Sequence, residues 1–256
     1  MVSSNIKMRI FGLTGYPLEH SFSEKYFAEK FRNESINDAR YLNFPLKDIS
    51  MLPSLISGTP DLCGLNVTIP HKKAVMAFLD YIDNEASEAG SVNVIRIIRS
   101  SGRITLEGYN TDIYGFRESL SPFAVTAISQ ALVLGTGGSS ASVGFVLARM
   151  GIKVVFVSRR PAAGSVTYSN LNEEVVAQSK LIVNTTPLGM YPDINGKPAI
   201  PYQALTSSHI LYDLIYNPAE TPFLKEGIKR GCRVINGLEM LKLQAEKSWE
   251  IWNYHS

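Results

Sequence analysis

The sequence has few cysteines, no long apolar run and almost no excess of charge of either sign. Its two cysteines, Cys63 and Cys232, are too far apart for a metal knuckle or a C-x-x-C motif, and two cysteines make no disulfide framework. The longest apolar runs, such as residues 131–134, are far shorter than a membrane span. Lysine and arginine number 25 against 23 aspartate and glutamate, so the net charge of +2 offers no general attraction for nucleic acid or an anionic membrane. We therefore expect neither partner, and any affinity for anions must be local.

Other absences narrow the location and the chemistry. Residues 1–9 are polar and lack the apolar segment and cleavage site of a secretory signal, which together with the cysteine count favours a reducing compartment and a cytoplasmic protein. The four histidines show no ligand spacing such as H-E-x-x-H, so no metal is expected. What is present, 45% hydrophobic and 19% charged residues over 256 positions, is the composition of one large or two modest folded domains.

In the first part of the chain, short apolar runs alternate with helix-forming stretches, which predicts an α/β sheet domain. The runs are residues 8–12, 40–44 and 62–67. Residues 92–98 and 103–106 alternate around the turn residues 100–102, a pattern typical of a hairpin. We expect this hairpin to form an antiparallel edge on a mixed sheet and to close the first domain.

A second α/β series begins near residue 131. Strands are predicted at residues 131–134, 153–157, 181–184 and 210–214, and helices between them, one ending near residue 150 and one at residues 173–178. This alternation predicts a parallel, doubly wound sheet. The loop of residues 187–201 is rich in proline and glycine and is long enough for a lid or binding loop. From residue 237 onward, apolar residues at helical spacing predict a long amphipathic helix, and they are Leu238, Leu241, Ala245, Trp249 and Trp252.

A glycine-rich turn follows the predicted strand at residues 131–134. It consists of Gly135, Thr136, Gly137, Gly138 and Ser139. In this position glycines let backbone N–H groups approach a pyrophosphate at the positive end of the following helix. Ser140 stands where the common pattern has a third glycine, and a residue this small still allows close helix packing. The alternative is a plain strand-to-helix turn, but the βαβ context favours dinucleotide binding.

Two arginines end the next predicted strand, in the order Ser158, Arg159, Arg160. Dinucleotide-binding folds for NAD usually place a carboxylate here, about 20 residues after the glycine turn, to bind the ribose 2′-hydroxyl. A guanidinium group instead offers bidentate charged donors to a 2′-phosphate. We therefore expect NADP rather than NAD. Without the glycine turn, two solvated surface arginines would be the better interpretation.

Polar clusters punctuate the first domain. Ser21 and Glu24 have the spacing of a capping box for a helix over residues 24–32, which accounts for one serine and leaves Ser23 unexplained. Two hydroxyls at a helix start also make a reasonable carboxylate receptor.

Further along, Pro70 marks the start of another predicted helix, and Lys72 close after it would alone be read as a surface lysine. Asn93 interrupts a predicted strand, and residues 110–112 form a polar triplet at the exit of the hairpin. Each of these clusters has a turn or cap as its alternative interpretation.

Taken in order, the polar and glycine clusters form a set of motifs. They are H-S-x-S, N-V-T-x-P-x-K, G-x-V-N, N-T-D, G-x-G-G, S-R-R, N-T-T-P-x-G-M, Y-D-x-x-Y-x-P and G-x-x-M-L-x-x-Q. The set resembles the shikimate dehydrogenase family over residues 11–252. The resemblance implies a reversible, NADPH-dependent reduction of 3-dehydroshikimate to shikimate, in the route to chorismate and the aromatic amino acids.

The resemblance also implies roles for single residues. Lys72 would be the catalytic acid/base, with Asp112 as its partner. Substrate contacts would come from Ser21, Ser23, Thr68, Asn93, Asp112, Tyr216 and Gln244. Cofactor contacts would come from Gly135, Thr136, Gly137, Gly138, Ser139, Ser158, Arg159, Arg160, Thr185, Leu214, Gly237 and Met240. Lysine suits its role, because an ammonium group supplies both the proton and the positive charge that an alkoxide needs after hydride addition.

The same resemblance returns the last helix to the first domain. Residues 1–111, completed by 237–256, would form the substrate-binding catalytic domain, and residues 112–236 the Rossmann-like NADP-binding domain. Two positions depart from the family. Ile113 follows the N-T-D motif where glycine is usual, and Val94 follows Asn93 where threonine is common. These departures concern the local backbone and the polarity of the pocket, not the class of reaction.

Two alternatives stay open. A quinate/shikimate dehydrogenase of dual specificity would accept an extra ring hydroxyl and often use NAD, which the arginine pair disfavours. A non-catalytic NADP-binding sensor would have lost catalytic side chains, whereas Lys72, Asp112, Ser21 and Ser23 are all present. In either case we expect a small-molecule ligand and a monomer or homodimer.

Overall fold

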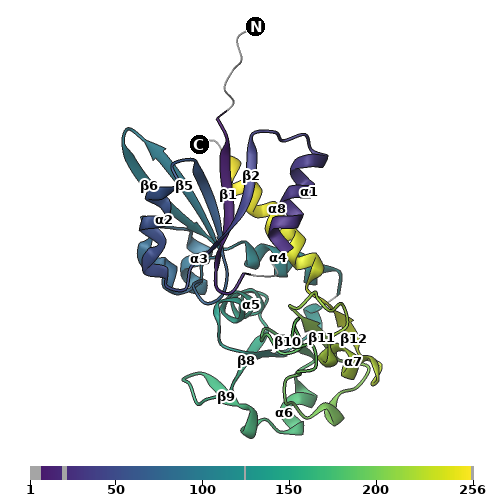
Figure 1. Cartoon of the computed structure of the whole chain (residues 1–256). Helices are drawn as coiled ribbons and strands as arrows, with labels where there is room; N and C mark the ends of the chain where they lie inside the picture. Colours follow the sequence, from purple (N-terminus) through teal and green to yellow (C-terminus); the bar gives the residue numbers. More distant parts are fainter. Residues whose placement is uncertain (1–6, 19–21, 124, 255–256) are drawn as a thin grey trace. The chain divides into compact units, whose positions relative to one another are not determined.

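The structure is a computed structural model of the chain, and it describes residues 7–18, 22–123 and 125–254. The chain forms two compact units. The first unit comprises Met1–Thr111 and Ala245–Ser256, and the second comprises Asp112–Gln244. Each unit is built around one sheet flanked by helices, which confirms the predicted α/β class (Figure 1).

The first unit contains a mixed six-stranded sheet in the order β2-β1-β3-β5-β6-β4. Its strands are β1 (Arg9–Gly15), β2 (Ala39–Pro45), β3 (Leu62–Val67), β4 (Tyr81–Ile82), β5 (Val94–Ser100) and β6 (Arg103–Tyr109). β1 pairs in parallel with β2 and β3, whereas β5 runs antiparallel to β3 and β6. The predicted hairpin is confirmed as β5 and β6. The prediction that this hairpin forms the edge of the sheet was wrong, because the short strand β4 pairs in parallel with the outer side of β6.

Helices of the first unit form two apolar cores with this sheet. They are α1 (Phe22–Asn33), α2 (Leu52–Gly58), α3 (Asn84–Ala89) and the last part of α8 (Leu238–Asn253). One core joins Leu52 of α2 and Ala86 of α3 to strand residues such as Leu65. In the other, Phe27 of α1 and Trp252 of α8 pack on β1, and Figure 1 shows the yellow end of α8 beside α1 and β1.

A glycine in β3 lets α8 come close to the sheet. A Cβ atom at Gly64 would lie 2.3 Å from Nε1 of Trp252, so no larger residue fits without a shift. The same Nε1 donates to the carbonyl of Ile95 at 3.0 Å. The predicted amphipathic helix is therefore confirmed as α8, and its buried Trp252 closes the first unit's sheet.

The segment after Pro70 differs from the prediction of a helix. It forms a turn followed by the 3₁₀ helix η2 (Ala74–Phe78). The physical reason lies at Lys72, whose carbonyl accepts from the backbone N–H of Val92 at 2.8 Å and so serves the neighbouring segment instead of a helical turn. His71 is buried, and its Nε2 lies 2.7 Å from the carbonyl of Leu46, which ties the turn to the core.

The second unit contains a six-stranded sheet in the order β12-β11-β10-β7-β8-β9. Its strands are β7 (Gln130–Leu134), β8 (Lys153–Ser158), β9 (Ser165–Thr167), β10 (Leu181–Asn184), β11 (Ile210–Asp213) and β12 (Arg233–Ile235). All neighbours pair in parallel. Counted from β7, this is the strand order of the doubly wound dinucleotide-binding fold. The prediction of a Rossmann-like domain is confirmed.

The central strands of this sheet are apolar and buried, as a sheet covered on both faces requires. Its helices are α4 (Thr111–Leu120), α5 (Gly138–Arg149), α6 (Glu173–Gln178), α7 (Pro222–Ile228) and the first part of α8. Short 3₁₀ turns complete the chain: η1 (Ile49–Met51), η3 (Ser121–Phe123), η4 (Val125–Ala127), η5 (Tyr168–Asn170) and η6 (Tyr202–Ala204). Among the described residues, no helix has both the length and the apolar character needed to cross a membrane.

Candidate active site

The second unit gathers the candidate cofactor residues at one edge of its sheet. Because all six strands are parallel, their carboxyl ends meet along this edge, which we call the second-unit edge. The glycine turn follows β7, Ser158 ends β8, and Thr185 follows β10. Leu214 follows β11 and Gly237 lies two residues after β12. Met240 lies beyond the edge, buried in α8.

The glycine turn between β7 and α5 combines a backbone conformation that favours glycine with hydrogen bonds between hydroxyl side chains. Gly135 has a φ of +121°, and a Cβ atom there would lie 2.7 Å from Oγ1 of Thr185. The Thr185 hydroxyl donates its single hydrogen to the carbonyl of Leu134 at 2.7 Å. The same oxygen must therefore accept from the hydroxyl of Ser140, 2.6 Å away. Ser140 in turn accepts from the backbone N–H of Gly137 at 3.1 Å. The serine in the third position is thus a brace that glycine could not supply.

Gly137 and Gly144 have two further roles that a glycine motif requires, open space beside the backbone and close packing of helix on strand. A Cβ atom at Gly137 would meet no atom within 4 Å, so the backbone before the first turn of α5 is open to a ligand. At Gly144 a Cβ atom would lie 2.4 Å from Cζ of Phe156, which brings α5 close to β8. The residues present therefore fit a pyrophosphate held at the start of α5. Sequence reasoning missed Gly144, although its place on the buried face of the predicted helix was a signal.

The turn after β8 presents two arginines to solvent. Ser158 is buried, and its hydroxyl donates to the carbonyl of Arg160 and lies 3.1 Å from Oγ of Ser165. This hydrogen bonding shapes the turn and leaves the side chains of Arg159 and Arg160 exposed. Burial raises the pKa of the Tyr168 phenol to about 12, an effect that the charge of Arg159 opposes. Two cations at the end of β8 fit a phosphate on the adenosine ribose.

Two candidates, Leu214 after β11 and Gly237 after β12, pack against each other through their backbones. A Cβ atom at Gly237 would lie 2.0 Å from the carbonyl oxygen of Leu214, so only glycine fits there. Tyr216 is half-buried, and burial raises the pKa of its phenol.

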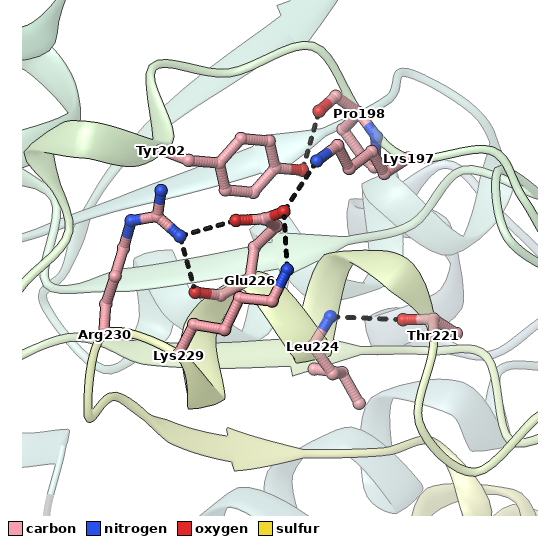
Figure 2. Close-up of polar contacts among 8 residues, drawn as sticks. All are labelled: Lys197, Pro198, Tyr202, Thr221, Leu224, Glu226, Lys229 and Arg230. Carbon is pink, nitrogen blue, oxygen red and sulfur yellow. Dashed lines mark hydrogen bonds and ion pairs between the residues drawn. The ribbon is translucent and has the colours of Figure 1, made fainter.

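The loop of residues 187–201 is fastened to α7 by a cluster of charges (Figure 2). Lys197 and Arg230 contact the carboxylate of Glu226 at 2.8 and 2.5 Å, and Lys229 lies 3.6 Å away. The hydrogen bonds from Lys197 and Arg230 lower the pKa of Glu226 to about 2. The phenol of Tyr202 donates to the carbonyl of Pro198 at 2.7 Å, which fixes the end of the loop.

Asp112 and Gln244 are buried on helices that pack closely within the second unit. Asp112 lies in the first turn of α4, and Gln244 on α8 donates from Nε2 to the carbonyl of Leu241 at 2.9 Å. Gly115 allows this packing, because a Cβ atom there would lie 2.7 Å from the carbonyl oxygen of Met240. Ile113, one of the two departures from the family pattern, is fully buried in the core.

The first unit gathers its candidates where β3 ends and β5 begins. The strand register places Asn66, Val94 and Tyr109 in one row across β3, β5 and β6. Thr68, Asn93 and Thr111 lie just beyond this row, along what we call the first-unit edge. Lys72 follows in the turn, half-buried, with its backbone held beside Val92. Val94, the second departure, is buried in the apolar core.

A chain of buried side chains braces the first-unit edge. Asn93 accepts from the backbone N–H of Thr111 at 2.7 Å and donates to its hydroxyl at 3.1 Å. The Thr111 hydroxyl lies 3.2 Å from that of Ser248 on α8, which accepts from Nδ2 of Asn66 at 2.9 Å. Asn66 then accepts from the phenol of Tyr41 at 2.8 Å. Sequence reasoning assigned no role to Thr111, Ser248, Asn66 or Tyr41, although Thr111 and Asn66 lie within motifs that it singled out.

Ser23 on α1 lies close to the Tyr41 end of this chain. Burial raises the pKa of Tyr41, and the neighbouring Ser23 partly opposes this effect. The other serine candidate, Ser21, lies outside the described residues. Among the described residues, no group of three or more His, Cys, Asp or Glu side chains is arranged to hold a metal ion.

The chain is similar to known proteins in both sequence and fold. Residues 13–95 match the family model described as the shikimate dehydrogenase substrate binding domain. A protein of Methanococcus aeolicus named shikimate dehydrogenase (NADP(+)) is 37% identical, over 97% of this chain and 93% of that protein.

Two solved structures have the same fold. Shikimate 5-dehydrogenase from Thermus thermophilus, in complex with NADP(H) and shikimate, is 29% identical with a TM-score of 0.83, over 96% of this chain and 94% of that one. Quinate dehydrogenase from Corynebacterium glutamicum, in complex with NAD, is 25% identical with a TM-score of 0.81, over 96% and 94%. Since the Methanococcus relative is matched over nearly its whole length, the chain belongs to the shikimate dehydrogenase family.

Proposed function

We propose that the chain catalyses the reversible NADPH-dependent reduction of 3-dehydroshikimate to shikimate, a step toward chorismate and the aromatic amino acids. One observation carries the cofactor choice: the second-unit edge combines an open glycine turn after β7 with two exposed arginines after β8. The names of the relatives at 33–37% identity support both the substrate and NADP.

In this proposal the second-unit edge holds the cofactor, which supplies the hydride when bound. The pyrophosphate lies against the glycine turn of residues 135–139, where Gly137 leaves the backbone open. Arg159 and Arg160 bind the 2′-phosphate, and Ser158 shapes their turn. The residues assigned to the nicotinamide side are Thr185, Leu214, Gly237 and Met240.

The chain's own contribution to the chemistry is proton transfer and binding. Lys72 donates a proton from Nζ to the oxygen of the reduced carbonyl, and its positive charge stabilises the developing alkoxide. The backbone that carries this side chain is held by the hydrogen bond from the N–H of Val92 to the carbonyl of Lys72 and by the neighbouring His71. For Asp112 we propose the part that the resemblance implies, partner in this proton transfer.

The substrate residues divide by chemistry. Ser23 in the first turn of α1, together with Ser21 two positions earlier in the sequence, offers hydroxyl donors for the carboxylate of the substrate. Thr68, Asn93, Tyr216 and Gln244 are assigned to ring hydroxyls or to the walls of the pocket. Both polar atoms of Asn93 already contact Thr111, so its contact with substrate would add to a bracing role.

The functional halves and the setting belong to the same proposal. Residues 1–111 with 237–256 form the substrate-binding half, and residues 112–236 form the cofactor half. Cys63 and Cys232 are both free thiols, which supports a cytoplasmic location. We propose a monomer or homodimer, and sedimentation of the purified chain decides between them.

The decisive experiment measures initial rates with shikimate and quinate, each with NADP+ and NAD+. We expect oxidation of shikimate with NADP+ to exceed every other combination by at least about tenfold. Appreciable quinate oxidation would instead support a dual-specificity enzyme. No turnover with any pair, while NADP+ still binds, would support a non-catalytic sensor.

A further inference from the structure

The side chain of Asp213, the last residue of β11, is fully buried and accepts three hydrogen bonds. Oδ1 accepts from Nδ2 of Asn184 at 3.0 Å and from the backbone N–H of Ile215 at 3.1 Å. Oδ2 accepts from the hydroxyl of Thr221 at 2.6 Å. An amide N–H cannot accept, so Oδ1 faces two obligatory donors. A carboxylate, which only accepts when ionised, matches this surrounding.

Asn184 must face Asp213 with its nitrogen. Its Oδ1 accepts from the backbone N–H of Thr186 at 3.1 Å and from the Thr186 hydroxyl at 2.7 Å, and the backbone donor admits only an acceptor. Asn184 is the last residue of β10, and its carbonyl also accepts from the N–H of Leu214 at 3.0 Å. The ends of β10 and β11 are therefore joined by both side chains and backbone.

Thr221 extends the connection to α7. It is the N-cap of that helix, and its hydroxyl accepts from the backbone N–H of Leu224 at 3.3 Å, as Figure 2 shows. Asp213, Asn184 and Thr221 are all fully buried. We call these three side chains the Asp213 cluster, and it ties together three segments at the second-unit edge.

The Asp213 cluster buries a carboxylate, and removing a charged group from water lowers the stability of the folded protein. Burial raises the pKa of Asp213 to about 6, so the charged form is disfavoured although it still predominates near pH 7. Apolar side chains of similar volume often stabilise a protein as well as or better than a buried charged group. A gain in stability is therefore a poor explanation for this carboxylate, whereas exact placement of the joined segments is a good one.

The joined segments carry the candidates for one half of the cofactor. Thr185 lies between Asn184 and Thr186, and Leu214 directly follows Asp213. Gly237 donates its N–H to the carbonyl of Ile215 at 3.0 Å, which brings the exit of β12 into the same assembly. A doubly wound sheet binds a dinucleotide as two halves, and the glycine turn and arginines occupy the half of β7, β8 and β9. The other half, of β10, β11 and β12, is the one that the Asp213 cluster organises.

We propose that Asp213 is a positioning residue for the nicotinamide half of the cofactor site. It sets the places of Thr185 and Leu214 through the Asp213 cluster, and its own hydrogen bonds reach neither the glycine turn nor the arginines of the adenosine half. The inference rests on the proposed function, since it requires NADP to bind at the second-unit edge.

The test compares two ligands by calorimetric titration of the purified full chain. NADP+ spans both halves of the site, whereas adenosine 2′,5′-bisphosphate lacks the nicotinamide, its ribose and the phosphate attached to that ribose. For Asp213→Ala we expect the Kd of NADP+ to rise at least about tenfold and the Kd of the bisphosphate to stay within about twofold. Asp213→Asn should restore NADP+ binding to within about threefold, because its amide can donate to Thr221 while its oxygen accepts from Asn184 and Ile215.

A matched control removes a buried hydrogen bond elsewhere in the same sheet. Ser179 is fully buried and accepts from Nε2 of Gln130 at 2.9 Å, near the amino end of β7. Ser179→Ala should lower the thermal midpoint and leave both dissociation constants within about twofold. If Asp213→Ala fails to fold, Thr221→Val replaces it, with the same selective but smaller loss of NADP+ affinity.

Three results would overturn the role of Asp213. Asp213→Ala could lose affinity for both ligands equally, it could lose affinity for neither, or Asp213→Asn could fail to recover NADP+ affinity. Failure of NADP binding at the second-unit edge would look different, because the unaltered chain would then bind neither ligand. Failure of the proposed reaction alone would appear as absent turnover in the unaltered chain, with both dissociation constants still measurable.

Discussion

The two sheet edges hold their candidate residues by different means. At the second-unit edge the turn after β7 depends on backbone shape, with a positive φ at Gly135 and open space at Gly137. At the first-unit edge a chain of side chains, from Tyr41 through Asn66 and Ser248 to Thr111, braces Asn93. The glycine turn is thus open at its backbone, whereas the first-unit edge is braced by side chains that hydrogen-bond to one another.

This difference predicts different responses to substitution. Where the backbone forms the site, a small added side chain should lower the affinity for the ligand and leave the stability of the fold unchanged. Where side chains brace one another, loss of a single hydroxyl should weaken the fold around several residues at once, because a buried partner is left unsatisfied. Each prediction below tests one side of this contrast.

The largest expected effect is at Lys72 on the first-unit edge. Lys72→Ala removes the proposed proton donor and its charge, so turnover should fall about 10²- to 10⁴-fold. The KM for shikimate should change much less, because the lost interaction acts mainly in the transition state. Steady-state kinetics in both directions measure these values. Lys73→Ala, at the exposed neighbour, is the control, and near-normal turnover of Lys72→Ala would refute the role in proton transfer.

Arg159 on the second-unit edge should give the next largest effect. Arg159→Ala removes a charged donor to the 2′-phosphate, so the KM for NADPH should rise about 10- to 100-fold while that for NADH changes little. The control is Arg233→Ala, an exposed arginine at the start of β12 and therefore at the opposite edge of the sheet. Equal effects on the two cofactors would remove Arg159 from the phosphate site.

Gly137 tests the backbone character of the second-unit edge directly. Its φ of −79° suits alanine and a Cβ atom would meet no neighbour, so Gly137→Ala should keep the thermal midpoint of the wild type. The methyl group would stand in the proposed path of the pyrophosphate, and the Kd of NADP+ should rise about tenfold. Gly58→Ala makes the same change at an open glycine of α2 in the first unit. Unchanged NADP+ affinity in Gly137→Ala would mean that the ligand does not approach this turn.

The same contrast explains what could be predicted from the sequence. The prediction for residues 181–184 matches β10, because the strand is a buried apolar run with clear boundaries. The glycine turn was found because its spacing is local. The strands β9 and β12 have three residues each and carry too little pattern to be recognised. The helix predicted after Pro70 failed because the carbonyl of Lys72 bonds to Val92, a partner that local sequence does not reveal.

The bracing side chains were out of reach for a similar reason. Asn66 and Ser248 are 182 positions apart, and they meet only because α8 returns to the first unit. Asp213 and Asn184 meet because β10 and β11 pair in register. Single polar residues carry no periodic signal, so their contacts depend on topology. Family resemblance identified the candidate site residues but not the side chains that support them.

Ser248 gives the smallest expected effect and the sharpest test of the first-unit edge. Ser248→Ala removes the acceptor for Nδ2 of Asn66, while Thr111 keeps its contacts with Asn93. Leaving one buried donor unsatisfied should lower the free energy of unfolding by about 1 kcal/mol, measured by urea denaturation. Ser87→Ala, on the exposed surface of α3, should change it by less than about 0.5 kcal/mol. Because the brace supports Asn93, the KM for shikimate should also rise in Ser248→Ala while the Kd of NADP+ stays constant. A loss of stability without any change in this KM would mean that the hydrogen-bonded side chains support only the fold and not substrate binding. The contrast between the two edges would then have no bearing on function.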